Sequence, residues 1–265
     1  MSSNQPRSAR EAYNAFAPIY EEFTVQNDHE AWLGGLLLPE LGKRGLKVGR
    51  ALDVGCGTGK AFAPLLARGW EVYGCDASDG MLAEAAAKHP DVPLLCADAT
   101  DLPVYGFGFD LVLALNDVTN YLVEDGDLER FFARVGRNLA ADGLFLFDRN
   151  TIRLMRKSFA GPESAWMSRG RWKWRGSGDV VIPGGIFEAE LSGPAVRSHV
   201  HRQRHWTPAQ VQAALAASGL ACLAVLGQRE EGEKILLSEA LEEDRDEKAI
   251  YIAGRAAGRG AEART

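Results

Sequence analysis

A glycine-rich stretch and the aspartate within it are the residues of this chain best suited to hold a ligand. Residues 51–59 read Ala-Leu-Asp-Val-Gly-Cys-Gly-Thr-Gly, with Asp53 two positions before the first of Gly55, Gly57 and Gly59. Glycines let the backbone turn sharply and approach a ligand with no Cβ in the way. The apolar residues around Asp53 predict a buried strand, and residues 60–68 predict a helix whose free N–H groups point into the turn. This order of elements indicates a nucleotide-type cofactor.

The spacing of the glycines disfavours two common cofactors. A dinucleotide-binding turn follows G-x-G-x-x-G, and its third glycine would stand where this chain has Lys60. A P-loop ends in Gly-Lys-Ser/Thr, but Ala61 follows the lysine here. NAD and ATP are therefore disfavoured, and a dehydrogenase is kept only as a minor alternative.

The stretch resembles instead the first motif of class I S-adenosylmethionine-dependent methyltransferases, in which an acidic residue, here Asp53, precedes G-x-G-x-G. Asp76 follows a second predicted strand over 70–75. An acidic residue at this place accepts hydrogen bonds from both ribose hydroxyl groups. The alternative is that Asp76 caps the next helix, although Ser78 or Asp79 could do so instead.

The resemblance implies further contacts to the cofactor, S-adenosylmethionine. Asp98, after a predicted strand over 93–97, would accept the adenine amino proton while the N–H of Ala99 meets a ring nitrogen. Met81 would cover one face of the adenine, with a core methionine as the alternative. The other residues that we expect to contact the cofactor are Tyr20, Ala77, Leu115 and Asn116.

The methyl acceptor is expected at the end of a fourth strand, predicted over 109–115, because ligands of such sheets bind outside the carboxyl ends of the strands. The residues there are Asn116, Asp117, Asn120 and Tyr121. Turn and cap roles for the first two are the alternative. The resemblance adds Tyr13 and Tyr20, since many small-molecule methyltransferases close a tyrosine-bearing N-terminal segment over the cofactor. A stripe of aromatic residues packed on the core is the other interpretation.

An inserted antiparallel sheet, predicted over 166–175, 180–191 and 196–205, is expected to choose the substrate. Alternation gathers four cations on one face of its first strand, Arg169, Arg171, Lys173 and Arg175. They would form a cup for an anionic substrate or pair with Glu188 and Glu190. The last strand carries a row of His199, His201, Gln203 and His205. No carboxylate or cysteine set accompanies this row at ligand spacing, so no metal is expected. The substrate-binding candidates are Asn120, Arg149, Arg171 and Lys173.

The expected reaction is in-line displacement of the methyl group by a lone pair of the acceptor, in which orientation contributes several kcal/mol or more. An amine acceptor must also lose a proton. The candidates for positioning it or taking that proton are Tyr13, Asp117, Tyr121 and His201, with His199 as an alternative base. We expect N-methylation of a small molecule, as in the glycine and amino-sugar N-methyltransferases that the chain resembles. An O-methyltransferase and a non-catalytic S-adenosylmethionine-binding protein are the alternatives.

These residues require an α/β fold to position them. The resemblance implies a Rossmann-like, seven-stranded, mostly parallel sheet with helices on both faces. Pro18 is expected to break or restart a helix that begins near Glu11. Residues 230–247 are expected to be a loop or short helix. The predicted division is an N-terminal helical lid, a cofactor-binding core, the inserted sheet, the rest of the core and a flexible tail, at 1–48, 49–150, 151–206, 207–254 and 255–265.

The composition of the chain limits the classes of partner and the compartment that we expect. The formal net charge of −6 disfavours nucleic acid, because a duplex binder needs a positive surface. No apolar run approaches about 18 residues and the N-terminus has no signal-like leader, so neither a membrane span nor secretion is expected. Four cysteines without a C-x-x-C pair are typical of thiols in a reducing cytoplasm. The sequence leaves open whether the chain forms a homodimer.

Overall fold

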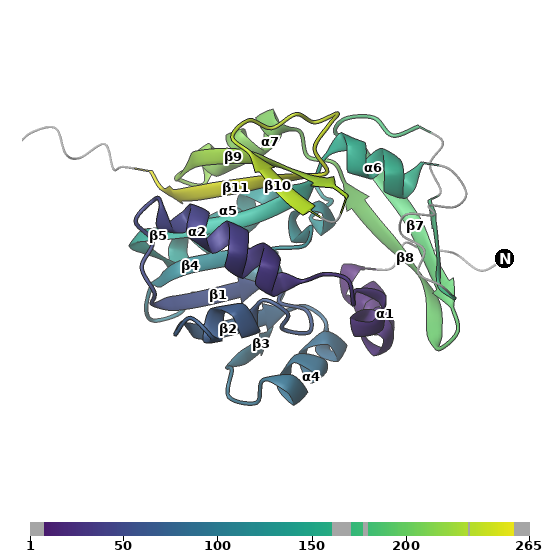
Figure 1. Ribbon diagram of the computed structural model, residues 1–265, viewed down its shortest axis with the longest axis horizontal. Helices are drawn as coiled ribbons and strands as arrows, with labels where there is room; N and C mark the ends of the chain where they lie inside the picture. Colours follow the sequence, from purple (N-terminus) through teal and green to yellow (C-terminus); the bar gives the residue numbers. More distant parts are fainter. Residues whose placement is uncertain (1–7, 161–170, 177–179, 233, 257–265) are drawn as a thin grey trace, which may run out of the picture.

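The computed structural model describes residues 8–160, 171–176, 180–232 and 234–256. Its larger sheet has eight strands in the order β10 (Lys234–Ser238), β9 (Leu220–Glu231), β11 (Lys248–Arg255), β5 (Leu139–Asn150), β4 (Phe109–Ala114), β1 (Arg50–Val54), β2 (Glu71–Asp76) and β3 (Leu94–Cys96). A second, antiparallel sheet has the order β6 (Lys173–Gly176), β7 (Ile186–Gly193) and β8 (Val196–Arg204) (Figure 1).

The large sheet confirms the predicted fold class. Strands β1 to β5 run parallel, and β11 lies antiparallel between β5 and β9. One strand more is present than predicted, because β9 extends to Glu231 and β10 returns beside it where a loop or short helix was expected. Gly232 adopts a φ of 64°, which suits the tight turn of this hairpin. Of the three apolar residues of β10, Ile235 and Leu237 are half-buried and Leu236 is exposed, so the apolar pattern that marks a strand is weak here.

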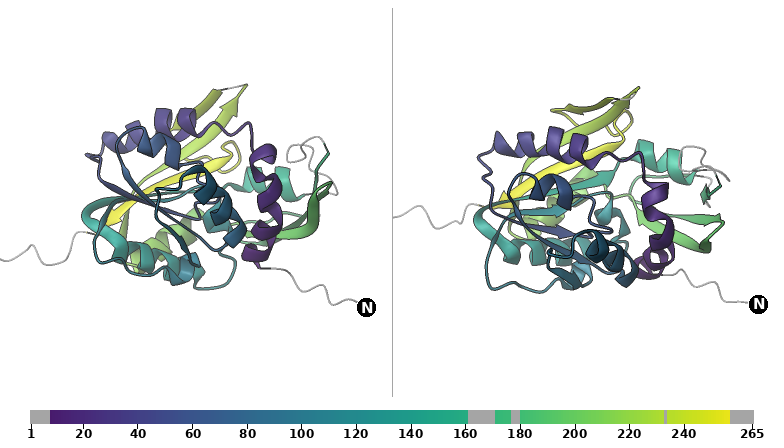
Figure 2. Two further views of the ribbon diagram at one scale, coloured as in Figure 1. Left: turned by 90° about the horizontal axis from the view of Figure 1, so that it is seen from below. Right: turned by 60° about the horizontal axis from the view of Figure 1, so that its bottom comes forward.

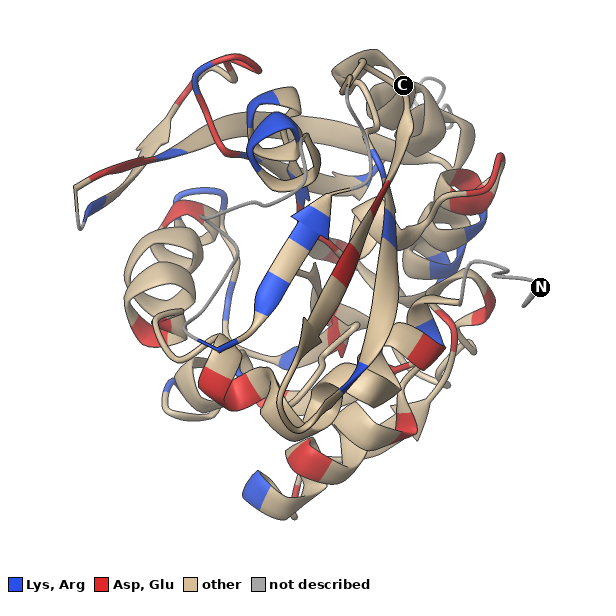
Figure 3. Ribbon diagram, turned by 90° about the vertical axis from the view of Figure 1, so that its right-hand side faces the viewer, with Lys and Arg blue, Asp and Glu red and all other residues tan. Residues whose placement is uncertain are grey.

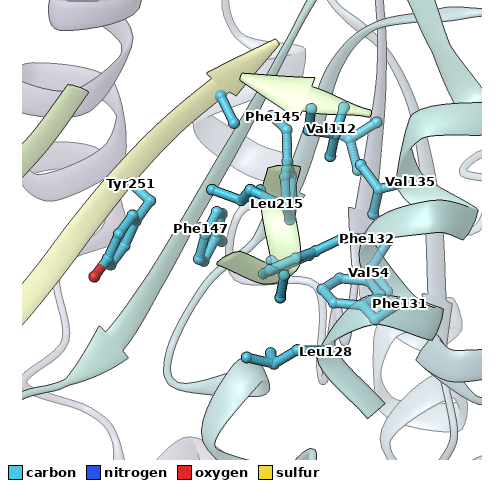
Figure 4. Close-up of a cluster of buried hydrophobic side chains, with 14 of the residues drawn as sticks. Val54, Val112, Leu128, Phe131, Phe132, Val135, Phe145, Phe147, Leu215 and Tyr251 are labelled. Carbon is cyan, nitrogen blue, oxygen red and sulfur yellow. The ribbon is translucent and has the colours of Figure 1, made fainter. Parts of the chain in front are cut away.

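Helices cover both faces of the large sheet (Figure 1). On one face α5 (Asp127–Asn138) and α7 (Pro208–Ala217) pack on aromatic residues of the sheet, among them Phe145 and Phe147 (Figure 4). On the other face lie η1 (Glu30–Leu37), α2 (Leu38–Gly42) and α3 (Phe62–Leu66). These two apolar layers hold the strands rigidly, so that their carboxyl ends can present ligand-binding residues.

The N-terminal helix α1 (Ala9–Phe23) lies beside the inserted sheet (Figure 2). It runs unbroken through Pro18, so the predicted break there is wrong. Packing keeps the helix intact, since Phe16 and Phe23 on either side of the proline are buried against Trp172 of the insert. Asn14 also ties α1 to α4 (Asp79–Lys88), because its Oδ1 accepts hydrogen bonds from the hydroxyl of Ser78 and the N–H of Gly80.

The insert between β5 and α7 contains a helix that the sequence did not reveal, α6 (Ile152–Phe159), capped by Thr151. Its first strand is described from residue 171 onward, so that Arg169 and the start of the predicted strand lie outside the described residues. The second strand begins at Ile186 and not at Val180, because residues 182–185 form a turn. In the described part of the chain, no helix is long and apolar enough to cross a membrane.

Candidate active site

A cavity, which we call the glycine-turn cavity, lies at the carboxyl ends of β1, β2 and β4. Most residues predicted to contact the cofactor line it: Tyr20, Asp53, Gly55, Gly57, Asp76, Ala77, Asp98, Ala99, Leu115 and Asn116, together with the catalytic candidates Tyr13 and Tyr121. The parallel strands bring together residues that are far apart in the sequence. The candidate set thus forms one site in space.

The glycine turn bends the backbone at this cavity, which Gly55 and Gly57 line. Gly55, Gly57 and Gly59 have φ angles of 72°, 54° and 79°, a region that other residues rarely adopt. A Cβ on Gly55 would lie 2.5 Å from a methyl group of Val118, whereas one on Gly57 would meet open space. Gly57 is therefore the position at which the backbone is left bare toward a ligand.

Asp76 links the glycine turn to α4. Its Oδ2 accepts a hydrogen bond from the N–H of Gly57 and its Oδ1 one from the N–H of Ser78, both at 2.8 Å. The helix cap is the hydroxyl of Ser78, which accepts from the N–H of Met81, so the cap alternative for Asp76 does not hold. Burial raises the pKa of Asp76, and the backbone N–H groups counteract this in part.

Asp53 is the most strongly perturbed carboxyl group of the cavity. Burial, reinforced by the charge of Asp76, raises its pKa to about 8. Two neighbouring carboxyl groups that resist ionisation fit a ligand that brings positive charge and hydroxyl groups. The amino and sulfonium groups and the ribose of S-adenosylmethionine supply these.

Of the remaining residues predicted to contact the cofactor, some line the cavity and others do not. Asp98 lines the cavity while its Oδ1 accepts hydrogen bonds from the N–H and hydroxyl of Thr100, at 2.8 and 2.6 Å. Met81 and Gly59 are not among the residues that line the cavity. Met81 is fully buried in the cluster beneath α1, as the alternative of a core methionine requires.

A second cavity, the aromatic chamber, adjoins the first and shares Tyr13, Tyr20, Asn116 and Tyr121 with it. Its other aromatic walls include Phe16, Phe159 and Trp174, and its polar lining includes Asp117, Asn150, His201, Gln203 and Lys248. The tyrosines stand where the cavities meet. A group transferred between two ligands would have to pass this junction.

Strained backbone aims polar groups at the junction. Asn116 and Asp117 have positive φ angles of 59° and 61°, an uncommon conformation for two successive residues other than glycine. The Oδ2 of Asp117 accepts hydrogen bonds from the side-chain amides of Gln203 at 2.5 Å and Asn150 at 3.2 Å. Burial raises the pKa of Asp117 to about 6, although the ammonium of Lys248 opposes the rise. Asp117 is therefore ionised at neutral pH.

Of the predicted histidine row, His201 and Gln203 line the chamber. His201 is buried, and its Nδ1 lies 2.8 Å from the hydroxyl of Tyr121. Its Nε2 lies 2.9 Å from Nε2 of His199. Burial, with His199 nearby, lowers the pKa of His201 well below its usual value, so the ring is neutral.

Four predicted substrate-binding residues line neither cavity. Asn120 is buried, donates to the carbonyl of Arg204 and accepts from the N–H of Asn150, so that it joins β5 to the insert. Arg149 is fully buried and pairs with Glu243, because the alternation of β5 turns it away from the face of Asn150. The other two are cations of the insert, Arg171 and Lys173.

In the described part of the insert, the glutamate-bearing strand β7 lies between β6 and β8, which carry Lys and Arg residues (Figure 3). Arg171 pairs with Glu22 of α1 at 3.1 Å, and Arg202 pairs with Glu188 at 3.7 Å. Arg175 stands opposite Glu190 in the β6–β7 register. The geometry follows the interpretation in which these cations pair with neighbouring carboxylates.

Several polar residues of the two cavities were not assigned to a site from the sequence, among them Lys248, Asn150 and Gln203 of the chamber and His29 of the glycine-turn cavity. Lys248 reaches Asp148 and the chamber from β11, 100 residues away in the chain. Asn150 and Gln203 hold Asp117, and His29 accepts a hydrogen bond from the amide of Asn116 at 3.0 Å if its Nδ1 carries the proton. Among the described residues no group of three or more His, Cys, Asp and Glu side chains is arranged to hold a metal ion.

Comparison with known proteins gives a family match over the glycine turn and the strands that follow it. A family model described as "Methyltransferase domain" matches residues 51–143, which include the glycine turn, Asp76 and Asp98. This segment of the chain is therefore similar to a methyltransferase domain. The match confirms the enzyme class and the methyl donor, S-adenosylmethionine, that the glycine motif predicts for this domain.

Relatives and solved structures agree with the methyltransferase domain. The chain is 35% identical over 142 residues to a protein of Geobacillus sp. (strain WCH70) named as a methyltransferase, covering 51% of this chain and 56% of the relative. It is 32% identical over 159 residues to a ubiquinone biosynthesis O-methyltransferase of Azorhizobium caulinodans, covering 56% of this chain and 58% of the relative. The matched segments thus span little more than half of these relatives.

Two solved structures resemble the fold over nearly the whole chain. An S-adenosylmethionine-dependent methyltransferase from Clostridium acetobutylicum gives a TM-score of 0.73 at 21% identity, covering 93% of this chain and 100% of that one. CalS10, an amino pentose methyltransferase from Micromonospora echinaspora, gives 0.60 at 18% identity, covering 97% and 100%. At these identities the likeness concerns the fold alone, and it includes the insert as well as the core.

Proposed function

We propose that this protein transfers a methyl group from S-adenosylmethionine to an amine nitrogen of a small molecule. The glycine-turn cavity would hold the donor, with Asp76 at its ribose, Asp98 at its adenine and Asp53 near its charged end. The aromatic chamber would hold the acceptor. The likeness to an amino pentose methyltransferase supports an amine, and the structure supports it independently through charge.

The observation that carries the proposal is the charge balance beside the chamber. Asp117 lines the chamber and donates its backbone N–H to the fully buried Asp148 at 2.9 Å. Lys248 is the cation that interacts with both carboxyl groups. Burial alone would lower the pKa of Lys248, but Asp148 and Asp117 raise it, so the ammonium persists. Two carboxylates and one ammonium leave one negative charge uncompensated. A protonated amine would neutralise it, whereas a neutral hydroxyl would not.

Asp117 would also prepare the amine for reaction. No hydrogen bond from the described residues reaches its Oδ1, and both side-chain donors reach Oδ2. An ammonium group bound at Oδ1 can pass its proton to the carboxylate, which frees the nitrogen lone pair. S-adenosylmethionine supplies an electrophilic methyl group to that lone pair. The aromatic walls exclude water and hold the nitrogen in line, and orientation of this kind contributes several kcal/mol.

The segments then take distinct roles. We propose that residues 49–150 and 207–254 hold the donor, that residues 1–48 close over it through Tyr13 and Tyr20, and that residues 151–206 select the acceptor. Residues 255–265 are proposed as a tail. The cytoplasm is the proposed compartment, because all four cysteines are free thiols.

A labelled-donor screen tests the proposal. The protein is incubated with methyl-labelled S-adenosylmethionine and paired amines and alcohols of equal carbon skeleton, and mass spectrometry locates the label. Label on amines only is the expected result. Label on alcohols only would show an O-methyltransferase, the alternative favoured by the name of the Azorhizobium relative. Calorimetric binding of the donor without any methylated product would favour a non-catalytic binding protein.

A further inference from the structure

A chain of hydrogen bonds leads from the junction of the two cavities into the insert. The hydroxyl of Tyr121 lies 2.8 Å from Nδ1 of His201, whose Nε2 lies 2.9 Å from Nε2 of His199. The Nδ1 of His199 lies 2.8 Å from the backbone carbonyl oxygen of Arg197. Both histidines are buried, so both rings favour the neutral form, which has one donor and one acceptor nitrogen.

The carbonyl at the end of the chain sets its direction. A carbonyl oxygen can only accept, so Nδ1 of His199 carries the proton and its Nε2 is an acceptor. The Nε2 of His201 must then donate to it, which leaves Nδ1 of His201 as an acceptor. Tyr121 therefore donates its hydroxyl proton to His201, away from the junction. One backbone carbonyl thus determines the orientation of three hydrogen bonds.

Tyr13 lies beside Tyr121 at the junction. Its ring meets that of Tyr121 edge-on, with centroids 5.1 Å apart. Burial raises the pKa of both phenol groups, so both hydroxyl groups stay protonated. The direction of the Tyr121 proton therefore decides what its oxygen offers to the junction.

Packing holds this arrangement in place. The ring of His201 lies against Trp174 with centroids 4.9 Å apart and an interplanar angle of 32°. The edge of Phe16 meets it at 5.6 Å, at an angle of 79°. Rings held on two sides cannot turn over without opening the chamber wall. The tautomers are therefore a property of the folded chain.

We propose that His199 and His201 are positioning residues that make the hydroxyl group of Tyr121 a hydrogen-bond acceptor at the point of methyl transfer. The inference rests on the proposed amine acceptor. A phenol proton pointing into the junction would capture the amine lone pair and suppress attack. An acceptor oxygen instead holds an N–H proton and leaves the lone pair toward the methyl group. The site would thus favour acceptors that carry at least one N–H.

Nitrogen-15 NMR of the histidine side chains tests the direction without any substrate. The chain has five histidines, and His199→Gln and His201→Gln variants assign the two signals of interest. We expect a proton on Nδ1 of His199 and on Nε2 of His201 near pH 7.5. In Tyr121→Phe, His201 should keep its proton on Nε2, because the direction is set from the Arg197 carbonyl through His199. A proton on Nδ1 of His201, or on both nitrogens of His199, would overturn the proposal.

A double-mutant cycle tests the consequence with an amine that the screen identifies. Tyr121→Phe removes the proton to be directed, so His201→Gln should lower kcat at least tenfold in the wild-type background and change it less than twofold in Tyr121→Phe. The KM for the donor should stay constant. Equal losses in both backgrounds would show a structural role only. His205→Gln, which removes another buried histidine of the insert, is the matched control. If no amine is methylated, the proposed function fails while the NMR result still decides the direction.

Discussion

Replacement of Asp53 by asparagine should stabilise the empty protein and weaken its binding of the donor. The carboxyl group is buried and its pKa is raised to about 8, whereas in the unfolded chain it ionises near its usual value of about 4. Between these values the folded protein holds a proton that the unfolded chain has lost. Stability therefore falls as pH rises from about 4 to about 8.

The size of the effect follows from this window. Each pH unit in this window lowers the free energy of unfolding by about 1.4 kcal/mol. At pH 7 the wild type is therefore less stable by about 4 kcal/mol than at low pH, an upper value because buried groups relax. Asparagine keeps the shape and has no charge to desolvate. We expect Asp53→Asn to gain about 2–3 kcal/mol at pH 7, or roughly 4–12 °C in Tm. Its stability should depend less on pH between 4 and 8.

The assay is thermal unfolding over this pH range with and without S-adenosylmethionine. The donor should stabilise the wild type strongly and the variant weakly, because the variant has lost a carboxylate that faces the positive charge of the donor. Asp53→Ala serves as the control for loss of packing and should not gain stability. An Asp53→Asn protein that melts below the wild type and still binds the donor at wild-type affinity would refute both the raised pKa and the ligand role.

Four further predictions follow from the site. Asp76→Ala should weaken donor binding by about 1–3 kcal/mol, measured by calorimetry, since it removes charge-assisted hydrogen bonds to the ribose; unchanged affinity would exclude that role. For wild type, kcat/KM for an amine should rise with pH through about 6 as Asp117 ionises, and Asp117→Asn should remove this step; a step that persists belongs to another group. Glu21→Gln breaks the contacts of α1 with Lys88 and the glycine-turn segment, so amide exchange in α1 should quicken severalfold, and an unchanged rate would show that apolar packing alone holds the helix. Arg171→Ala should change KM less than twofold, because its partner Glu22 is 61% exposed; a large rise in KM would restore the predicted cationic cup.

The cofactor side of the site was predictable because local sequence specifies it. Glycines at fixed intervals, and aspartates at or near the carboxyl end of each strand, need only the parallel βα pattern to meet in space. Asp53, Asp76 and Asp98 therefore line the cavity as expected.

The acceptor side depends on pairings between distant segments. Lys248 enters the chamber because β11 pairs antiparallel with β5 in the register that sets it opposite Asn150. No spacing within the sequence encodes that register. Arg149 was misplaced for the same reason, since β5 runs to Asn150 and its alternation turns the guanidinium toward Glu243. Strand ends and registers decided which side chains faced the chamber.

Helix α1 walls both cavities through Tyr13 and Tyr20. Both reactants and both products would enter and leave past α1. Displacing the helix to admit one molecule also opens the cavity of the other to solvent, so substrate binding and product release would be coupled in time. The order of binding would depend on which ligand stays bound while its cavity is open. The rate-limiting step would then be the movement of α1 and not the transfer of the methyl group.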